Sequence, residues 1–331
     1  MAPIRLGVDI GSTTVKLAAL DENGRLLHGT YERHRSDIGS TLARMLAEAA
    51  AALGGSRVYE AAVTGSAGIG VASRLGLPFV QEVIACSQAV ETYLPGTDVA
   101  VELGGEDAKI TYFGEQLDQR MNGSCAGGTG AFIDQMAVLL GVDAAGVDEL
   151  ASRAHTVYPI AARCGVFAKA DIQPLINEGA RREDIAASVL QAVVNQTISG
   201  LACGRPIRGR VAFLGGPLHF LPELRRRFAE TLKLKPEEML VPADGRLFVA
   251  LGAALAAAEE NAARRAASVQ AAAQSGGPAT APVGGPAAVH AGAAASVPTL
   301  DALVAVARES RPSGAEERRL PPLFADEAAR E

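Results

Sequence analysis

The sequence lacks tryptophan, has few aromatic residues and carries no strong excess of one charge. Of its 331 residues only 4% are Phe, Trp or Tyr, and the formal net charge is −6 at pH 7. So mild a negative charge does not favour nucleic acid or an anionic membrane surface as a partner. No uninterrupted apolar run approaches the ~20 residues of a membrane span. The N-terminal run Ile4–Ile10 contains an aspartate, unlike a signal peptide. These absences favour a cytoplasmic protein that binds neither nucleic acid nor membrane.

The four cysteines, Cys86, Cys125, Cys164 and Cys203, include no C-x-x-C pair. Without that spacing, a self-contained zinc site and a cytosolic disulfide framework are both disfavoured. Cys125 and Cys164 each precede a segment with helical periodicity. The unpaired N–H groups of a helix N-terminus stabilise a thiolate or an anionic cluster. We expect Cys86 and Cys203 in the core, where free cysteine is most often found.

The Walker A sequence is also missing, so a P-loop site is not predicted. The chain instead repeats one pattern, L-G-V-D-I-G-S-T-T-V-K at 6–16 and V-A-V-E-L-G-G-E-D-A-K at 99–109. In this register three positions coincide: Asp9 with Glu102, Gly11 with Gly104, and Lys16 with Lys109. Each copy reads as a strand, a glycine turn, a second strand, a short turn and a third strand. A repeat of this length can define the fold.

Helical patterns follow each three-stranded unit, which predicts an α/β fold of two related domains with a cleft between them. We place the first domain at residues 1–95 and the second at 96–265. From 266 to 331 the chain is rich in Ala, Gly, Pro and Ser. Such a composition predicts a flexible tail or linker, in which only Leu300–Ala307 is able to form a helix.

A glycine turn between two strands presents unhindered N–H groups to a phosphate. One such turn is also compatible with an ordinary hairpin, but two in one register indicate ATP bound between the domains. Asp9 is predicted to hold Mg²⁺ through water or to orient the attacking water, with Glu106 and Asp107 as further catalytic residues. Lys16 either contacts phosphate or faces solvent. The predicted cofactor contacts are Gly11, Ser12, Thr13, Thr14, Lys16, Gly104, Gly105, Lys109, Gly127, Gly128, Thr129, Gly215 and Gly216, the last two for adenosine.

Several of these segments resemble one known family, the ATP-dependent activators of 2-hydroxyacyl-CoA dehydratases and benzoyl-CoA reductases. These BadF/BadG/BcrA/BcrD-type ATPases belong to the superfamily of actin, heat-shock proteins and sugar kinases. The resemblance covers roughly Leu6 to Ala258. Its most specific segments are Asp9–Lys16, Leu103–Lys109, Cys125–Asp134, Cys164–Ala168, Gly215-Gly216 and Leu251-Gly252-Ala253-Ala254. It implies two ribonuclease-H-like, actin-like ATPase domains that bind ATP or ADP in the cleft between them.

The same resemblance implies the redox chemistry. In that family two cysteines per subunit bind one [4Fe–4S] cluster shared across a homodimer, and here they are Cys125 and Cys164. A cubane cluster takes about four thiolates, which two subunits would supply. ATP hydrolysis then drives a low-potential electron from a ferredoxin or flavodoxin donor onto a dehydratase or reductase partner.

The chain departs from the family pattern at the second turn, where Glu102 replaces Asp and Glu106 replaces Gln. Glu106 adds a negative charge beside the γ-phosphate site. The stretch 158–175 looks most like larger fused members, so the chain is also compatible with the N-terminal part of such a protein. Two alternatives stay open: a sugar or hydroxy-acid kinase of the same superfamily, which leaves Cys125 and Cys164 without a role, and a nucleotide-switched scaffold without redox chemistry.

Overall fold

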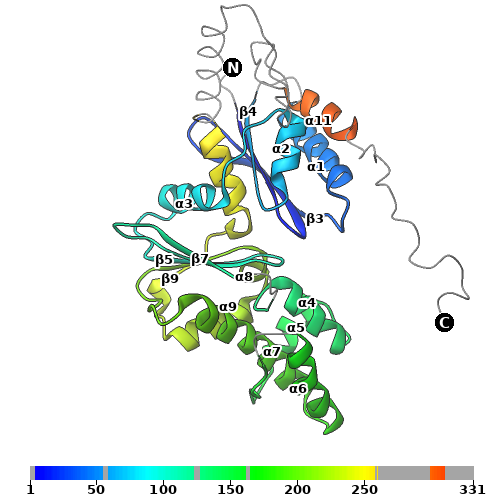
Figure 1. The fold of residues 1–331 in the computed structure, drawn as a ribbon, viewed down its shortest axis with the longest axis vertical. Coiled ribbons are helices and arrows are strands. Elements are labelled where there is room, and N and C mark those ends of the chain that lie inside the picture. The colour runs from blue at the N-terminus through cyan, green and yellow to red at the C-terminus, as the bar shows by residue number, and fades with distance from the viewer. Residues whose placement is uncertain are drawn as a thin grey trace, which may run out of the picture.

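The computed structural model describes residues 4–54, 59–122, 127–161, 165–257, 259 and 299–309. They form two α/β domains, each built on one sheet, with helices on the outer faces and between the sheets (Figure 1). The two-domain α/β architecture predicted from the repeat is confirmed.

The first domain contains a four-stranded sheet in the order β3-β2-β1-β4. β1 runs antiparallel to β2 and parallel to β4. Both β1 and β2 are almost entirely buried because their residues are apolar on both faces. The elements are β1 (Ile4–Ile10), β2 (Thr14–Leu20), β3 (Leu26–Arg33), α1 (Ile38–Leu53), β4 (Tyr59–Thr64), α2 (Gly68–Leu75) and α3 (Glu82–Tyr93).

The second domain repeats this plan with an added edge strand, in the order β7-β6-β5-β8-β9. Its strands are β5 (Val99–Leu103), β6 (Ala108–Tyr112), β7 (Asp118–Met121), β8 (Val211–Leu214) and β9 (Met239–Leu240). Its helices are α4 (Gly130–Leu139), α5 (Ala144–Ala151), α6 (Gly165–Asn177), α7 (Arg182–Thr197), α8 (Gly216–Phe220) and α9 (Pro222–Leu232). A π-helix continues α7 at Ile198–Ala202, and short 3₁₀ turns occupy Pro236–Glu238 and Gly245–Leu247.

Two helices fill the space between the sheets, α3 and the apolar helix Gly245–Ala257 (Figure 1). Their buried side chains form one core with residues of both sheets, including Ala62 and Ala212. The helix Gly245–Ala257 lies so close to β1 that a Cβ on Gly7 would stand 1.9 Å from the carbonyl oxygen of Ala250. The helix Gly245–Ala257 therefore packs on the sheet of the first domain.

The longest helical stretch, Arg182–Ala202, is apolar and long enough to cross a membrane by length and composition, and 67% of its most apolar window is buried inside the protein. It packs against α5 and α9 in the second domain. Its apolar residues are those of a central core helix.

Within the predicted tail, the described residues 299–309 form α11 (Leu300–Glu309), where the sequence allowed a short helix. Its buried residues Leu300, Leu303 and Val304 join the core of the first domain, and the helix lies along α1 (Figure 1). The rest of 266–331 lies outside the described residues.

Candidate functional site

The two glycine turns of the repeat have the same backbone hydrogen bond. The N–H of Gly11 donates to the carbonyl of Thr14 at 3.0 Å, and the N–H of Gly104 donates to the carbonyl of Asp107 at 2.7 Å. Each turn joins the first two strands of its sheet, β1 to β2 and β5 to β6. The register predicted from the sequence is therefore confirmed in the backbone.

The first turn is flanked by a buried ion pair. Asp9 is 3% exposed and lies opposite Lys16 in the β1–β2 ladder, and Lys16 Nζ donates to Asp9 Oδ2 at 2.8 Å. Burial lowers the pKa of Lys16, but Asp9, together with Tyr31 and Glu102, raises it, and the pKa is raised overall. Lys16 is therefore charged and faces Asp9 inside the cleft instead of solvent.

The second turn has the equivalent pair and a third charge that the sequence reasoning missed. Lys109 lies opposite Glu102, with 3.8 Å between Nζ and Oε1, and also bonds to Glu82 at the start of α3. Burial lowers the pKa of Lys109, and the carboxylates of Glu102 and Glu82 reverse this and raise it overall. The Glu82–Lys109 pair links the two domains. An acidic residue at the start of a helix is too common to single out Glu82 from sequence.

A buried histidine, His34, is hydrogen bonded to the first turn. His34 is buried, and the N–H of Ser36 donates to its Nδ1 at 3.1 Å. Because Nδ1 accepts, the proton of the neutral ring sits on Nε2, which donates to the carbonyl of Gly11 at 3.2 Å. His34 stands outside the repeated segment, so the pattern did not reveal it.

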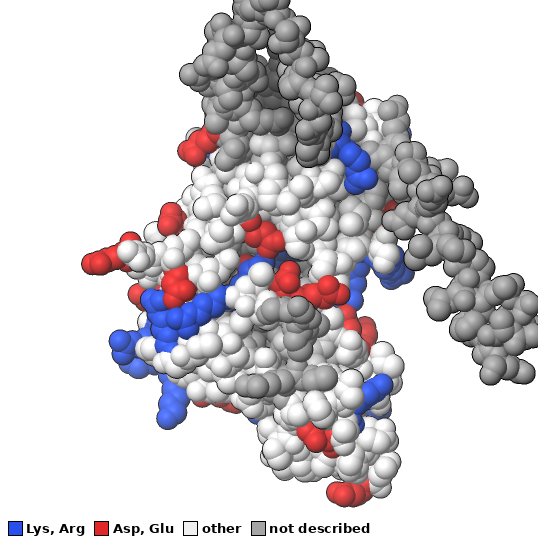
Figure 2. All heavy atoms as spheres, in the orientation of Figure 1, with Lys and Arg blue, Asp and Glu red and all other residues white. Residues whose placement is uncertain are grey.

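The two turns meet across the cleft at very short range. A Cβ on Gly105 would lie 1.9 Å from Thr13 Oγ1, so only glycine permits this approach. The cavity beside this contact measures about 20 Å³, room for about one water molecule. Nucleotide pockets take roughly 300–1,000 Å³, so the domains must separate to admit one. Figure 2 shows acidic and basic side chains side by side where the domains meet.

Most of the predicted phosphate and adenosine contacts gather at this cleft. The small cavity is lined by Asp9, Thr14, Lys16, Tyr31, Glu102, Gly104, Gly105, Leu214, Gly215, Gly216, Gly245, Arg246, Phe248 and Val249. A second cavity of about 130 Å³ shares Thr14, Gly105 and Gly216 and adds Thr13. A larger cavity of about 670 Å³ lies away from the cleft, between α1 and α11.

Other predicted site residues line neither cleft cavity: Gly11, Ser12, Glu106, Asp107, Lys109, Gly127, Gly128 and Thr129. Gly128 packs on α7, where a Cβ would lie 3.0 Å from Gln196 Cγ. Thr129 is fully buried at the start of α4. The Glu106 side chain is exposed and Asp107 is half-buried. The roles of these residues in binding and catalysis stay predictions.

Aromatic and basic side chains surround the predicted adenosine turn. A Cβ on Gly216 would lie 2.3 Å from the Tyr31 hydroxyl. Tyr31 packs edge-on against Phe220, with 5.5 Å between ring centroids. Burial and the Arg246 charge lower the pKa of His219, and Arg246 Nη1 lies 2.8 Å from His219 Nε2. The neutral ring therefore accepts a bond from Arg246. These side chains come from β3, from α8 and from the 3₁₀ turn Gly245–Leu247, and they share no motif, so the sequence did not group them.

The predicted cluster ligands Cys125 and Cys164 lie outside the described residues. Within the part of the chain that the structure describes, no group of three or more His, Cys, Asp or Glu side chains is placed to hold a metal ion. Cys86 is buried, as expected. The expectation for Cys203 was wrong, because this residue takes a left-handed φ of 47° after the π-helix and is exposed.

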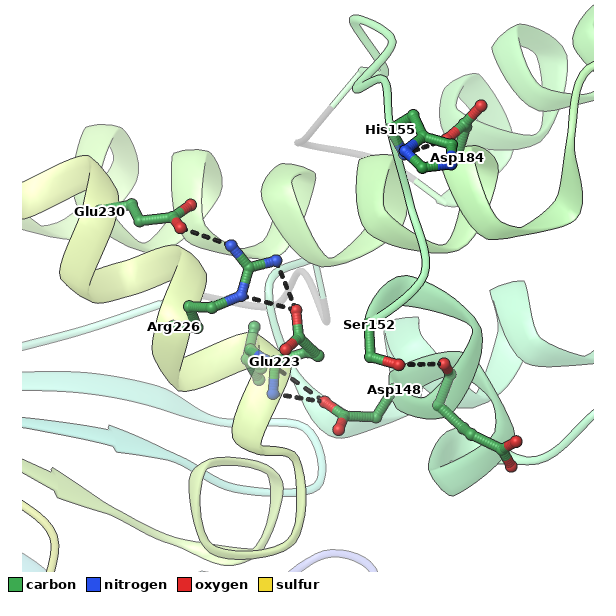
Figure 3. A network of polar contacts seen from close by, with 9 residues as sticks. Asp148, Ser152, His155, Asp184, Glu223, Arg226 and Glu230 are labelled. Carbon is green, nitrogen blue, oxygen red and sulfur yellow. Dashed lines mark hydrogen bonds and ion pairs between the residues drawn. The ribbon is translucent and has the colours of Figure 1, made fainter.

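A polar network away from the cleft joins the helices of the second domain (Figure 3). Asp148 of α5 accepts from the N–H groups of Glu223 at 2.9 Å and Leu224 at 3.3 Å, at the start of α9. Burial raises the pKa of Asp148 to about 6 despite these bonds. Asp184 of α7 accepts from the N–H groups of His155 and Thr156, which lower its pKa. Both carboxylates hold helices and loops in place.

Two repeated α/β domains that close on one cavity through glycine turns are the architecture of the actin-like ATPases. The chain belongs to the BadF/BadG/BcrA/BcrD ATPase family, whose sequence model matches residues 6–257. The resemblance inferred from the sequence motifs is therefore confirmed.

Characterised relatives agree with this assignment. The chain is 30% identical over 184 residues to the 2-hydroxyisocaproyl-CoA dehydratase activator of Clostridioides difficile, covering 55% of this chain and 67% of that one. The crystal structure of Acidaminococcus fermentans (R)-2-hydroxyglutaryl-CoA dehydratase component A has a TM-score of 0.70 at 25% identity and covers 79% of this chain and 100% of its own. The structure of the Clostridium difficile activator with bound ADPNP has a TM-score of 0.69 at 25% identity, covering 80% and 97%.

Proposed function

We propose that this chain is an ATP-hydrolysing activator that delivers a low-potential electron to a 2-hydroxyacyl-CoA dehydratase or a benzoyl-CoA reductase-type partner. The observation that carries the proposal is the pair of glycine turns, each with an acid and a lysine in register, that face each other across one cavity. The similar activator with bound ADPNP and the dehydratase activators among the relatives support it.

In this proposal the backbone N–H groups and hydroxyls of the two turns hold the ATP phosphates when the domains separate. Asp9 holds Mg²⁺ through water or orients the attacking water, as acids do at such sites. Lys16, bonded to Asp9 at 2.8 Å, is within reach of the same phosphates. Gly215 and Gly216 support the adenosine, with Tyr31 and Arg246 nearby.

Cys125 and Cys164 from each subunit of a homodimer supply the four thiolates of one [4Fe–4S] cluster, which carries the electron. The described residues support this at one point: α4 and α6 begin at Gly130 and Gly165, shortly after these cysteines. A helix N-terminus stabilises thiolates and an anionic group. A cytoplasmic ferredoxin or flavodoxin is the donor.

The test is anaerobic purification followed by iron, sulfide and absorbance measurements, and then ATP-dependent reduction of a 2-hydroxyacyl-CoA dehydratase. Cys125→Ser is expected to lose the cluster and electron transfer while ATP still binds. The matched control is Cys203→Ser, which changes an exposed thiol and is expected to keep both. A chain without iron that phosphorylates a sugar or hydroxy acid would instead support a kinase.

A further inference from the structure

Tyr31 of the first domain lies directly against the turn predicted to hold adenosine in the second. It is paired with Lys16 in the β2–β3 ladder, so the two side chains share one face of the sheet, and both line the cleft. The Tyr31 hydroxyl approaches Gly216 so closely that a Cβ on Gly216 would lie 2.3 Å from it. No ligand atom can enter between the phenol and this turn while the contact lasts.

A second contact holds the Tyr31 ring in that place. The ring packs edge-on against Phe220, with 5.5 Å between ring centroids and 62° between ring planes. Gly216 begins α8 and Phe220 ends it, so both contacts of Tyr31 are with one short helix. Edge-to-face aromatic pairs are favourable beyond the apolar area that they bury. The ring is therefore held against the second domain at two points.

The Tyr31 ring adjoins both cavities of the cleft. It lines the cavity of about 20 Å³ beside the glycine turns and also the neighbouring cavity of about 130 Å³. Among the described residues that line both, Tyr31 is the largest and the only aromatic one. Nucleotide pockets take roughly 300–1,000 Å³, more than either cavity offers. The room for a nucleotide that reaches from the phosphate turns to Gly216 therefore includes the place of this ring.

We propose that Tyr31 occupies part of the nucleotide position in the closed chain, so that an incoming adenine nucleotide must displace its side chain. The proposal rests on the proposed function in one respect, namely that a nucleotide binds between the glycine turns and Gly216. Only molecules in which Tyr31 has left this place are competent to bind. The apparent Kd is therefore larger than the intrinsic Kd by the inverse of the competent fraction.

The sign of a mutational effect separates this role from an ordinary binding contact. A side chain that only contacts the nucleotide stabilises the complex, so its removal weakens binding. A side chain that occupies the nucleotide position stabilises the free chain, so its removal strengthens binding and speeds association. A side chain that only holds the domains together slows release, so its removal speeds release alone.

The test measures the Kd of ADP by calorimetry and its association and release rates by stopped flow, on the full chain. Tyr31→Ala is expected to lower Kd about five- to tenfold and to raise the association rate by a similar factor. The release rate is expected to stay within about twofold of the native value. Phe220→Ala removes one of the two contacts that hold the ring and should shift Kd in the same direction by about threefold. If Tyr31→Ala fails to fold, Tyr31→Leu is used.

Tyrosine emission reports the displacement directly, because the chain has five tyrosines and no tryptophan. Saturating ADP is expected to change the emission of the native chain, since Tyr31 leaves Phe220 and Gly216. Tyr31→Phe keeps the ring, so its Kd should lie within about twofold of the native value. It lacks the phenol, so most of the ADP-dependent emission change should disappear. A change that persists undiminished in Tyr31→Phe would show that Tyr31 does not move.

Tyr93→Ala is the matched control. Tyr93 is also a partly buried tyrosine that packs edge-on against a phenylalanine, Phe248, with 6.2 Å between ring centroids. Its side chain lines neither cleft cavity. This variant loses an aromatic pair of the same kind and is expected to keep the association rate and Kd within about twofold of the native values.

The outcomes separate the two proposals. If neither the native chain nor Tyr31→Ala binds ADP, the proposed function is contradicted and this inference with it. If the native chain binds ADP but Tyr31→Ala binds it equally or more weakly, the inference is overturned and nucleotide binding stands. Faster release with unchanged association overturns it as well, because Tyr31 would then only hold the domains together. An equal gain in Tyr93→Ala would show a general loosening of the protein and would also overturn it.

Discussion

Arg33 of the first domain and Asp134 of the second form a two-bond ion pair across the cleft. Arg33 Nη1 donates to Asp134 Oδ2 at 2.6 Å and Nη2 donates to Oδ1 at 3.2 Å. Arg33 ends β3, Asp134 lies near the start of α4, and both line the 130 Å³ cavity. The paired geometry orients the two domains in the closed arrangement.

Arg33→Ala is therefore expected to speed nucleotide release. The side chains are 56% and 37% exposed, so the pair contributes at most about 1 kcal/mol, which corresponds to about a fivefold faster release. Displacement of fluorescent ADP in a stopped-flow instrument measures this rate, and the effect should shrink at high salt. Arg153→Ala, which removes the exposed ion pair with Glu149 at the end of α5, is the control. Equal rates in both variants would show that the Arg33 pair does not hold the cleft closed.

Glu106→Gln tests the unusual charge at the second turn. The Glu106 side chain is exposed beside Asp107, so its negative charge acts on any phosphate there through solvent. Removing it is expected to tighten ATP binding about two- to fivefold at low ionic strength and less at 0.5 M salt or so. Calorimetric titration gives Kd.

The control for Glu106→Gln is Glu115→Gln, which changes another exposed acid, in the loop between β6 and β7. The net charge changes by the same amount in both variants, so a general charge effect would appear in both. No difference between Glu106→Gln and the native chain would mean that this side chain does not sense the phosphates.

The sequence predicted those features of the fold that depend on neighbours along the chain. The first strand occupies the apolar run Ile4–Ile10, because an apolar run that ends at a glycine turn is a local signal. The repeat also aligned Asp9 with Glu102 and Lys16 with Lys109, and the structure gives both copies the same hairpin register. That the acid lies opposite the lysine within each hairpin is a finding of the structure.

Features that depend on distant segments did not follow from the sequence. Glu82 reaches Lys109 only because α3 crosses between the sheets. Phe220 meets Tyr31 because the two domains close on each other. The sequence allowed a helix at Leu300–Ala307 within a tail predicted to be flexible. That this helix packs on α1 could not be predicted, because it depends on the surface of the first domain. The hydrophobic periodicities of strands and helices, two and 3.6 residues, do not indicate which distant segments pack together.

Asp148 is expected to make stability depend on pH. Burial raises its pKa to about 6, above the ordinary value of 3.8, so the native state binds the proton more tightly than the unfolded chain does. The stabilisation of the folded state by this protonated side chain is therefore present below about pH 4 and is lost as pH rises through about 6. Asp148→Asn, which keeps an acceptor without the charge, should gain stability relative to the native chain over this range. Urea unfolding from pH 4 to pH 8 or so measures the difference.

Asp184→Asn is the matched comparison with the opposite sign. The N–H groups of His155 and Thr156 lower the pKa of Asp184, so its stabilising effect is present above the ordinary pKa and is lost on acidification. This variant should therefore lose stability relative to the native chain as pH rises from acid to neutral. If the stability of both variants relative to the native chain changed with pH in the same direction, the raised pKa of Asp148 would be contradicted.

Leu303→Ala is expected to destabilise the first domain although residue 303 lies beyond the family match at 6–257. Leu303 is 2% exposed and packs in the core that contains α1. Truncating a buried leucine costs about 2–5 kcal/mol, and the lower half of that range suits a helix at the edge of a core. A fall in the urea midpoint measures it.

The control for Leu303→Ala is Asp301→Ala, an exposed position on the same helix, which should leave the midpoint within about 0.5 kcal/mol of the native value. The pair of variants distinguishes docking from helix formation, because alanine is a good helix former at both positions. If Leu303→Ala were as stable as Asp301→Ala, α11 would contribute nothing to the ATPase domain. A loss confined to Leu303→Ala would establish that the segment after the family match is an integral helix of the first domain.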